Sequence, residues 1–178
     1  MRIILTGSKA SGKTTIGREL GKRLELEVVE TDTITEDLFA ARHGKAYNCR
    51  QICAHRGEPF FRDLEHDAVF EALKHEACII CTGGQTMMDA RCREALVKAG
   101  WVVLLQVRFE AIWERIERDG YPSYFPEANR KAWFADRVAQ FRRRVLPVAD
   151  SVCDVNDLSP AEATNRVMSV IENEVQIS

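Results

Sequence analysis

The chain has 178 residues, a length that fits one domain with a hydrophobic core of its own. Its net charge is −2 and 46% of its residues are hydrophobic, so composition gives no reason to expect a nucleic-acid or membrane partner. No apolar run approaches the roughly 20 residues that span a bilayer. The opening segment MRIILTGS also lacks the features of a secretory signal. We therefore expect a cytoplasmic protein, and nothing in the sequence demands more than a monomer.

Strands and helices are predicted to alternate from the start of the chain. Ile16, Leu20 and Leu24 recur at a spacing of four, which is typical of one face of a helix. In chain order, we predict a strand at 2–6, a helix at 13–24, a strand at 27–31, a short helix at 34–41, a loop with at most one helical turn at 43–56, and a helix at 59–75.

The same alternation continues through the second half of the chain. There we predict a strand at 77–81, helices at 89–99 and 109–118 around a strand at 101–107, a helix at 128–145, a strand at 151–155 and a terminal helix that Pro160 begins. Alternating elements of this kind favour a parallel sheet with helices on both faces. We predict a three-layer α/β/α fold with a central sheet of about five strands.

Six cysteines are present, and their pattern does not indicate a disulfide framework in a chain of this size. Cys78 and Cys81 lie in one predicted strand, where alternation places their side chains on opposite faces. This arrangement argues against a redox pair. Cys49, Cys53 and His55 lack a fourth ligand at a zinc-like spacing, so we interpret them as structural.

The segment GSKASGKT matches G-x-x-x-x-G-K-[ST] between a predicted strand and a predicted helix. In such a loop, backbone N–H groups and the helix N-terminus surround phosphate oxygens. Lys13 would contact the β- and γ-phosphates, and the Thr14 hydroxyl would bind Mg²⁺. The alternative is a glycine-rich turn without a ligand. The predicted ATP-binding loop residues are Gly7, Ser8, Lys9, Ala10, Ser11, Gly12, Lys13, Thr14 and Thr15.

The motif alone does not name the reaction. The chain lacks the N-K-x-D motif of guanine-nucleotide binding, and it is too short for a large motor. Its size favours a kinase of small metabolites or nucleotides.

Three segments carry a resemblance to one family. GSKASGKTTIGRELGKRLELEVVETD, GEPFFRDLE and IICTGG together resemble shikimate kinase, and the similarity extends to SVCDVNDLSP near the end. The resemblance implies a single P-loop kinase domain over residues 1–178. It also implies ATP as co-substrate, Mg²⁺ as cofactor, an acceptor-binding helical region at about 33–75 and a lid at about 118–127.

The resemblance assigns roles around the acceptor. Asp32 would bind acceptor hydroxyls and take the proton from the attacking one, and Glu30 would help to hold Mg²⁺. Arg62 would grip the acceptor carboxylate with its planar guanidinium. Gly83 and Gly84 would let backbone approach the acceptor. The alternatives are a helix N-cap for Asp32 and a surface ion pair for Arg62.

Other implied residues come from the second half of the chain. A second carboxylate-binding arginine is expected among Arg142, Arg143 and Arg144, and we choose Arg142. Arg115 would pack on one face of the adenine ring, and Pro160 would lie on the other side of the adenine site.

Two positions depart from the family pattern. Gln85 stands where the family has its third glycine, and Tyr121 precedes Pro122 where the family lid has an arginine. Arg118, at the start of the lid, is the residue that we expect to replace that arginine.

The leading hypothesis is transfer of the ATP γ-phosphate to a hydroxyl of shikimate. Gln85 and the unusual lid motivate two alternatives. One is a related kinase of another hydroxy acid such as gluconate. The other is a nucleotide-binding homologue that does not transfer phosphate.

Overall fold

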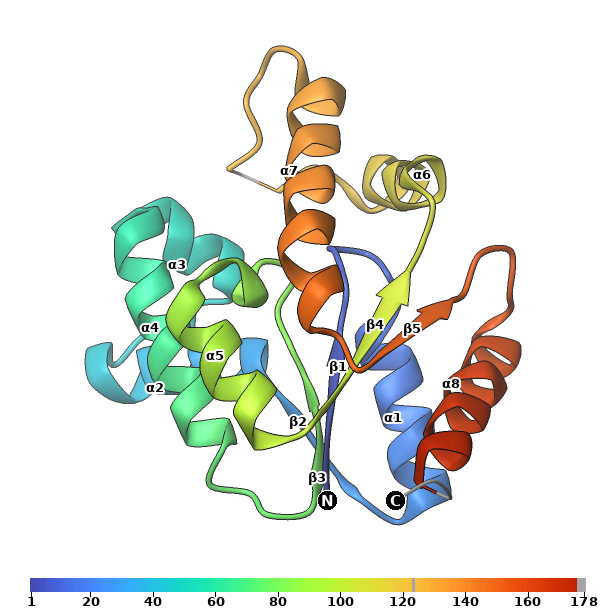
Figure 1. Ribbon diagram of the computed structural model, residues 1–178. Helices are drawn as coiled ribbons and strands as arrows, with labels where there is room; N and C mark the ends of the chain where they lie inside the picture. The colour runs from blue at the N-terminus through green and yellow to red at the C-terminus, as the bar shows by residue number, and fades with distance from the viewer. Residues whose placement is uncertain (123, 176–178) are drawn as a thin grey trace.

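Five strands form one parallel sheet in the computed structural model, which describes residues 1–122 and 124–175. Their order across the sheet is β2-β3-β1-β4-β5 (Figure 1). The strands are β1 (Arg2–Thr6), β2 (Glu27–Glu30), β3 (Cys78–Cys81), β4 (Trp101–Gln106) and β5 (Ser151–Asp154). The prediction of an α/β fold with a parallel sheet of about five strands is confirmed.

Helices cover both faces of the sheet and form the two outer layers (Figure 1). One face packs against α1 (Lys13–Leu24) and α8 (Pro160–Val175). The other face packs against α4 (Glu58–Ala72), α5 (Ala90–Ala99) and α7 (Arg130–Val145). The remaining helices are α2 (Thr31–His43), α3 (Cys49–Arg56), α6 (Phe109–Asp119) and two short 3₁₀ turns, η1 (Thr86–Met88) and η2 (Leu146–Val148). No helix in the described part of the chain combines the length and apolarity that crossing a bilayer requires.

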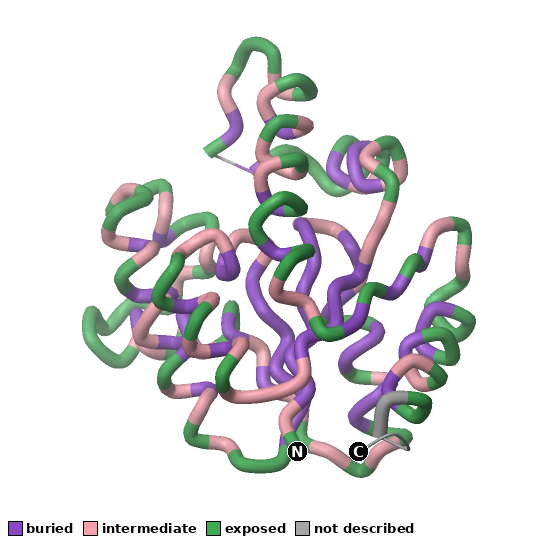
Figure 2. Tube along the Cα trace, viewed as in Figure 1, coloured by how far each residue is buried: buried purple, intermediate pink, exposed green. Residues whose placement is uncertain are grey.

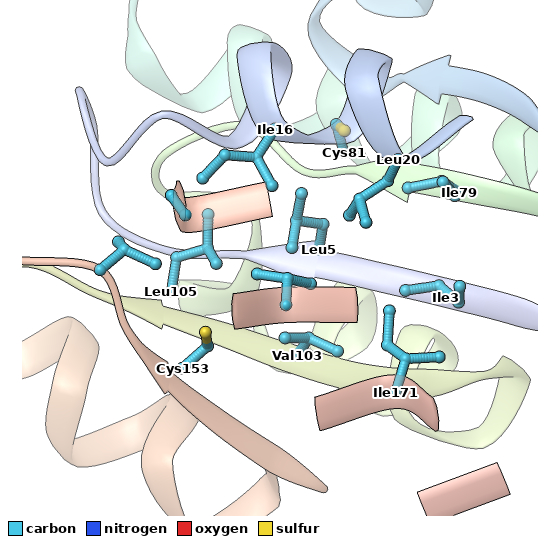
Figure 3. Packing of buried hydrophobic residues seen from close by; sticks show 13 residues of the cluster. Ile3, Leu5, Ile16, Leu20, Ile79, Cys81, Val103, Leu105, Cys153 and Ile171 are labelled. Atoms are coloured by element: carbon cyan, nitrogen blue, oxygen red, sulfur yellow. The ribbon is translucent and has the colours of Figure 1, made fainter. Parts of the chain in front are cut away.

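Strand alternation divides the core that packs on the sheet into two clusters, one on each face, and the central strands are buried along most of their length (Figure 2). In β1, Ile3 and Leu5 pack beneath α1 and α8, as Figure 3 shows, whereas Ile4 packs on the opposite face. The two cysteines of β3 follow the same rule. Cys81 lies in the first cluster and Cys78 in the second, so the predicted separation of these thiols is confirmed.

The order of the strands determines where a ligand can bind. β1 lies between β3 and β4, and the chain builds β2 and β3 on one side of it and β4 and β5 on the other. Ligands of open parallel sheets bind at the carboxyl ends of the strands where the order reverses in this way. The phosphate loop follows β1, Asp32 follows β2, and Gly83 follows β3. Three motifs that are far apart in sequence therefore meet at one edge.

Residues 49–56 form the helix α3, so the prediction of a loop with one helical turn was wrong there. Ile52 is the one buried residue among those eight, which leaves no hydrophobic period to detect. A capping box between Asn48 and Gln51 stabilises the helix instead. Several boundaries also differ from the prediction by one to three residues. Among the largest differences, α2 begins at Thr31 directly after β2, α4 ends at Ala72 and α7 begins at Arg130.

Candidate active site

The phosphate loop has the backbone shape that surrounds an anion. Ala10 and Gly12 have positive φ angles of 61° and 92°. Gly12 then opens α1, whose first turn receives no hydrogen bond from a capping side chain. The N–H groups of that turn therefore remain available to a ligand, and the helix dipole favours a negative one.

Lys13 is buried and points back into the loop. Its Nζ donates hydrogen bonds to the carbonyl oxygens of Gly7 and Ser8, at 2.9 Å each. Burial lowers the pKa of this amine to about 8, although the nearby Asp32 carboxylate opposes the shift. Lys13 thus lies within the loop, and its contact with phosphate stays a prediction. Phosphate charge would favour its protonated form.

A cavity of about 360 Å³ opens beside the loop and α1, within the roughly 300–1,000 Å³ of small-molecule sites. Arg115 reaches it from α6 and donates from its NH1 to the carbonyl oxygen of Ala10, at 2.8 Å. Arg118 lies at the same cavity and pairs with Asp119 at 2.9 Å. The predicted ATP-binding residues that line this cavity are Ala10, Ser11, Gly12, Thr15, Arg115 and Pro160.

The oxygens proposed for Mg²⁺ lie at the start of α1 and the end of β2. The Thr14 hydroxyl donates to a carboxylate oxygen of Glu30 at 3.1 Å. Arg18 also pairs with Glu30, at 2.8 Å. Among the described residues, no group of three or more His, Cys, Asp or Glu side chains could hold a metal. This donor set fits Mg²⁺, which commonly takes one or two protein oxygens and completes its shell with phosphate and water.

A second cavity lies on the other side of the phosphate loop, between the loop and the helices α2, α3 and α4. The side chains of Lys9 and Asp32 both line it. Asp32 occupies the first turn of α2, where Glu30 is the N-cap residue and makes no capping hydrogen bond. Asp32 is therefore not an N-cap, and its carboxylate is open to the cavity. Desolvation by the surrounding protein raises the pKa of this carboxyl, and the positive charges of Lys13 and Lys9 oppose the rise.

Arg62 enters the same cavity from α4 and is held from behind by two carboxylates. It donates to Glu65 at 2.6 Å and to Glu58 at 3.1 Å. Glu65 is only 3% exposed and also accepts a hydrogen bond from the Thr86 hydroxyl at 2.7 Å. Burial raises the pKa of the Glu65 carboxyl, and Arg62 counteracts the rise. This pair is therefore not a solvated surface ion pair. It fixes the Arg62 guanidinium at the cavity wall.

The two glycines after β3 serve close packing. A Cβ on Gly83 would lie 2.5 Å from Asp32 Oδ1 and 2.9 Å from Glu65 Oε1. The Gly83 N–H donates to the Thr31 hydroxyl at 2.8 Å, so it does not face the cavity as a donor. Gly84 does line the cavity, and a Cβ there would approach the Lys9 backbone to 3.0 Å. Because glycine has no side chain, the segment after β3 can pack directly against Asp32, Glu65 and the backbone of the phosphate loop.

Comparison with known proteins decides the family. The shikimate kinase family model matches residues 9–172. The chain is 30% identical to a shikimate kinase of Xylella fastidiosa over 93% of this chain and 89% of that protein. The chain belongs to the shikimate kinase family. A shikimate kinase of Nitratidesulfovibrio vulgaris is 34% identical over 83% of this chain and 80% of that one.

Solved structures agree with this assignment. The structure of a shikimate kinase from Acinetobacter baumannii in complex with shikimate superposes with a TM-score of 0.81 and 25% identity, covering 97% of this chain and 93% of that one. A tunicamycin resistance protein of Deinococcus radiodurans shares the fold at a TM-score of 0.63 and 19% identity. Membership of the shikimate kinase family therefore rests on sequence and structure together.

The expected lid, at about 118–127, joins α6 to α7 and includes residue 123, which lies outside the described residues. Its described part packs through aromatic side chains. Phe125 is buried against Trp113 and Phe134. Tyr124 turns toward the cavity that Asp32 and Arg62 line. Burial raises the pKa of Tyr124 to about 12, so its hydroxyl stays protonated and can donate.

The structure does not bring Arg142 to this cavity. Arg142 lines a different cavity near Ser8 and Phe109 at the base of the lid. Arg137, on the same helix, lies near the acceptor cavity instead and donates to Gln85 Oε1 at 3.4 Å. The reason is helical geometry, because five residues correspond to about 500°, or 140° from the starting direction. Gln85 thus contacts Arg137, which shikimate kinase resemblance alone did not predict.

Three further residues line the acceptor cavity and were not singled out as site residues from sequence. They are Cys49, Arg50 and Cys53 of α3. Burial raises the pKa of both thiols, so neither is a reactive thiolate. The capping-box signal at Asn48 and Gln51 was available in the sequence and would have placed this helix.

Proposed function

We propose that the protein transfers the γ-phosphate of ATP to a hydroxyl of shikimate, giving shikimate 3-phosphate. The observation that carries this proposal is the shared wall of the acceptor cavity. Lys9 of the phosphate loop, the Asp32 carboxylate and Arg62 all line that one cavity. A hydroxy acid bound there would place its hydroxyl between a carboxylate and the phosphate loop, with its own carboxylate on an arginine.

Asp32 has the chemistry to orient the acceptor hydroxyl and accept its proton. The hydroxyl oxygen forms a bond to the γ-phosphorus, and the bond between that phosphorus and the β,γ-bridging oxygen breaks to release ADP. The hydroxyl proton passes to the Asp32 carboxylate. The raised pKa of Asp32 makes this carboxylate a better proton acceptor than an ordinary aspartate.

The phosphate loop would stabilise the negative charge on the phosphoryl group. Lys13 and the N–H groups at the start of α1 would bind the phosphate oxygens. Thr14 and Glu30 would hold Mg²⁺, which would supply positive charge that stabilises the phosphate oxygens. Arg18 keeps the Glu30 carboxylate beside the Thr14 hydroxyl.

Recognition of the acceptor carboxylate would fall to Arg62, with Arg137 at the rim. Arg137 is stacked on the Trp133 ring at 4.5 Å and lies 3.8 Å from Glu58, which limits its movement. Tyr124 would cover the acceptor and help to exclude water, so that ATP is not hydrolysed instead. All these groups come from one chain, so the proposal requires only a monomer.

The proposal is tested with ATP, Mg²⁺ and a panel of hydroxy acids that includes shikimate and gluconate. Phosphorylation of shikimate supports it, and turnover of gluconate alone would select the related kinase. ATP binding with no phosphorylated product from any acid would indicate the nucleotide-binding homologue. Thermal stabilisation by shikimate, lost in Arg62→Ala while the ATP increment stays, would support the assigned carboxylate site.

A further inference from the structure

Gln85 lies on a well-anchored segment between the acceptor cavity and α7. It follows the two glycines after β3 and is the N-cap residue of η1. Its carbonyl oxygen accepts a hydrogen bond from the N–H of Met88 at 2.8 Å. The next two residues, Thr86 and Met87, are fully buried. Because these contacts fix the backbone, the Gln85 side chain starts from a defined position at the wall of the acceptor cavity.

Arg137 approaches Gln85 from α7. Its NH1 donates a hydrogen bond to Gln85 Oε1 at 3.4 Å, and the same nitrogen lies 3.8 Å from Glu58 Oε1. The centre of its guanidinium lies 4.5 Å from the centre of the Trp133 ring, one turn earlier on the helix. Contacts from three segments of the chain therefore hold this one guanidinium: the start of η1, the start of α4, and α7 itself.

Glu58 links this guanidinium to Arg62. The oxygen that lies near Arg137, Glu58 Oε1, also accepts a hydrogen bond from Arg62 NH2 at 3.1 Å. Glu58, Arg62 and Gln85 line both the acceptor cavity and an adjoining cavity of about 350 Å³, and Arg137 lines the adjoining one. The two arginines consequently lie next to one carboxylate oxygen, at the boundary that the two cavities share.

The amide at position 85 suits the task of holding an arginine without neutralising it. A guanidinium has five N–H donors, so a hydrogen bond to Gln85 Oε1 leaves others for a ligand. The amide oxygen is uncharged, whereas a carboxylate at this position would add negative charge beside an acceptor that is itself an anion. Glycine, the residue of the family pattern at this position, would offer Arg137 no partner.

We propose that Gln85 is a positioning residue for the acceptor: it holds Arg137 beside Arg62, so that both guanidiniums bind the acceptor carboxylate. This inference rests on the proposed function. A carboxylate has about four sites that accept hydrogen bonds, enough for two arginines at once. Gln85 acts through Arg137 and does not contact the reacting groups. Its contribution therefore falls on the binding of the acceptor and not on the phosphoryl-transfer step.

The test compares Gln85→Met, Arg137→Ala and the double variant in steady-state kinetics with ATP, Mg²⁺ and shikimate. Methionine keeps the length of the side chain and removes the amide. We expect Gln85→Met to raise the KM for shikimate about 5- to 10-fold, with kcat and the KM for ATP within about twofold of the wild type. Arg137→Ala should raise the KM for shikimate at least about 30-fold. The double variant should match Arg137→Ala, because Gln85 has no effect once its partner is gone.

Gln140→Met is the matched control. Gln140 is also on α7 and donates to Asp136 at 2.5 Å, and among the described residues it does not line the acceptor cavity. Its kinetics should match those of the wild type. Gln85→Glu gives a second, independent measurement, because it keeps the side-chain size and the accepting oxygen but adds a negative charge. We expect it to raise the KM for shikimate more than Gln85→Met does.

Four results would overturn the inference. They are an unchanged KM for shikimate in Gln85→Met, a fall in kcat without a rise in that KM, a KM of Gln85→Glu at or below the wild-type value, and a Gln85→Met effect that persists in the Arg137→Ala background. The last result would show that Gln85 contacts the acceptor directly. No product from the wild-type enzyme with any acid would instead contradict the proposed function.

Discussion

Replacing Arg62 by alanine should damage both stability and acceptor binding, and the two effects can be separated. Arg62 donates at 2.6 Å to Glu65, whose side chain is only 3% exposed. Without Arg62, Glu65 keeps one hydrogen bond, from Thr86. Breaking a buried ion pair costs about 3–5 kcal/mol. Because the Arg62 side chain is 26% exposed and water can enter, we expect about 1–3 kcal/mol of lost unfolding free energy.

The loss of stability should depend on pH with a definite sign. Burial already raises the pKa of Glu65, and removal of Arg62 removes the charge that opposes the rise. A group with a raised native pKa is neutral in both states at low pH and costs stability as pH rises above the unfolded value of about 4.5. The deficit of Arg62→Ala should therefore be small near pH 4 and reach its full size near neutral pH.

A second substitution isolates the binding role. In Arg62→Ala/Glu65→Gln, the buried charge is gone, so most of the lost stability should return. The KM for shikimate should stay raised by about 30-fold or more, since truncating a charged hydrogen-bonding partner typically costs about 2–5 kcal/mol. Urea unfolding and steady-state kinetics on the wild type and both variants measure the two effects. A KM for shikimate that returns to the wild-type value in the double variant would refute the carboxylate-binding role.

Three other outcomes follow from the same geometry. Gly83→Ala would push Asp32 away from its position, since the new Cβ would lie 2.5 Å from its carboxylate; a displacement approaching 1 Å should lower kcat about 100-fold, measured by steady-state kinetics on a variant shown to be folded. Because burial lowers the pKa of Lys13 to about 8, ATP binding above that pH should be accompanied by uptake of a proton, and the affinity for ATP should fall by up to about tenfold per pH unit. Calorimetry at pH 8.5 in two buffers of different protonation enthalpy measures this uptake. Equal binding enthalpies in the two buffers would contradict the prediction. Phe125→Ala should loosen the lid and raise the ratio of ADP to phosphorylated acceptor, whereas an unchanged ratio would show that the buried Phe125 ring does not control water access.

Features with a local physical cause could be predicted from the sequence. The phosphate loop follows from glycines and a lysine at fixed spacing, and the separation of Cys78 from Cys81 follows from strand alternation. The prediction that Asp32 and Arg62 share one site came from the family resemblance. No local sequence pattern shows that α2 and α4 pack side by side and direct both residues to one cavity.

Features that depend on helical phase or on long-range packing could not be predicted in the same way. Arg142 and Arg137 lie on one helix, and only the packing of α7 decides which of them approaches the acceptor cavity. Arg50 was missed because α3 has a single buried residue and no hydrophobic period. The contact between Gln85 and Arg137 joins residues 52 apart in sequence, which no local pattern encodes.

The proposed reaction moves the γ-phosphate of ATP onto shikimate, with Asp32 as the proton acceptor. Phosphorus NMR of a mixture of the enzyme, ATP, Mg²⁺ and shikimate tests it most directly. We expect ADP and a phosphate monoester of shikimate in equal amounts, and a rate reduced at least about 100-fold in Asp32→Asn. Release of inorganic phosphate without a monoester, or full activity in Asp32→Asn, would contradict it.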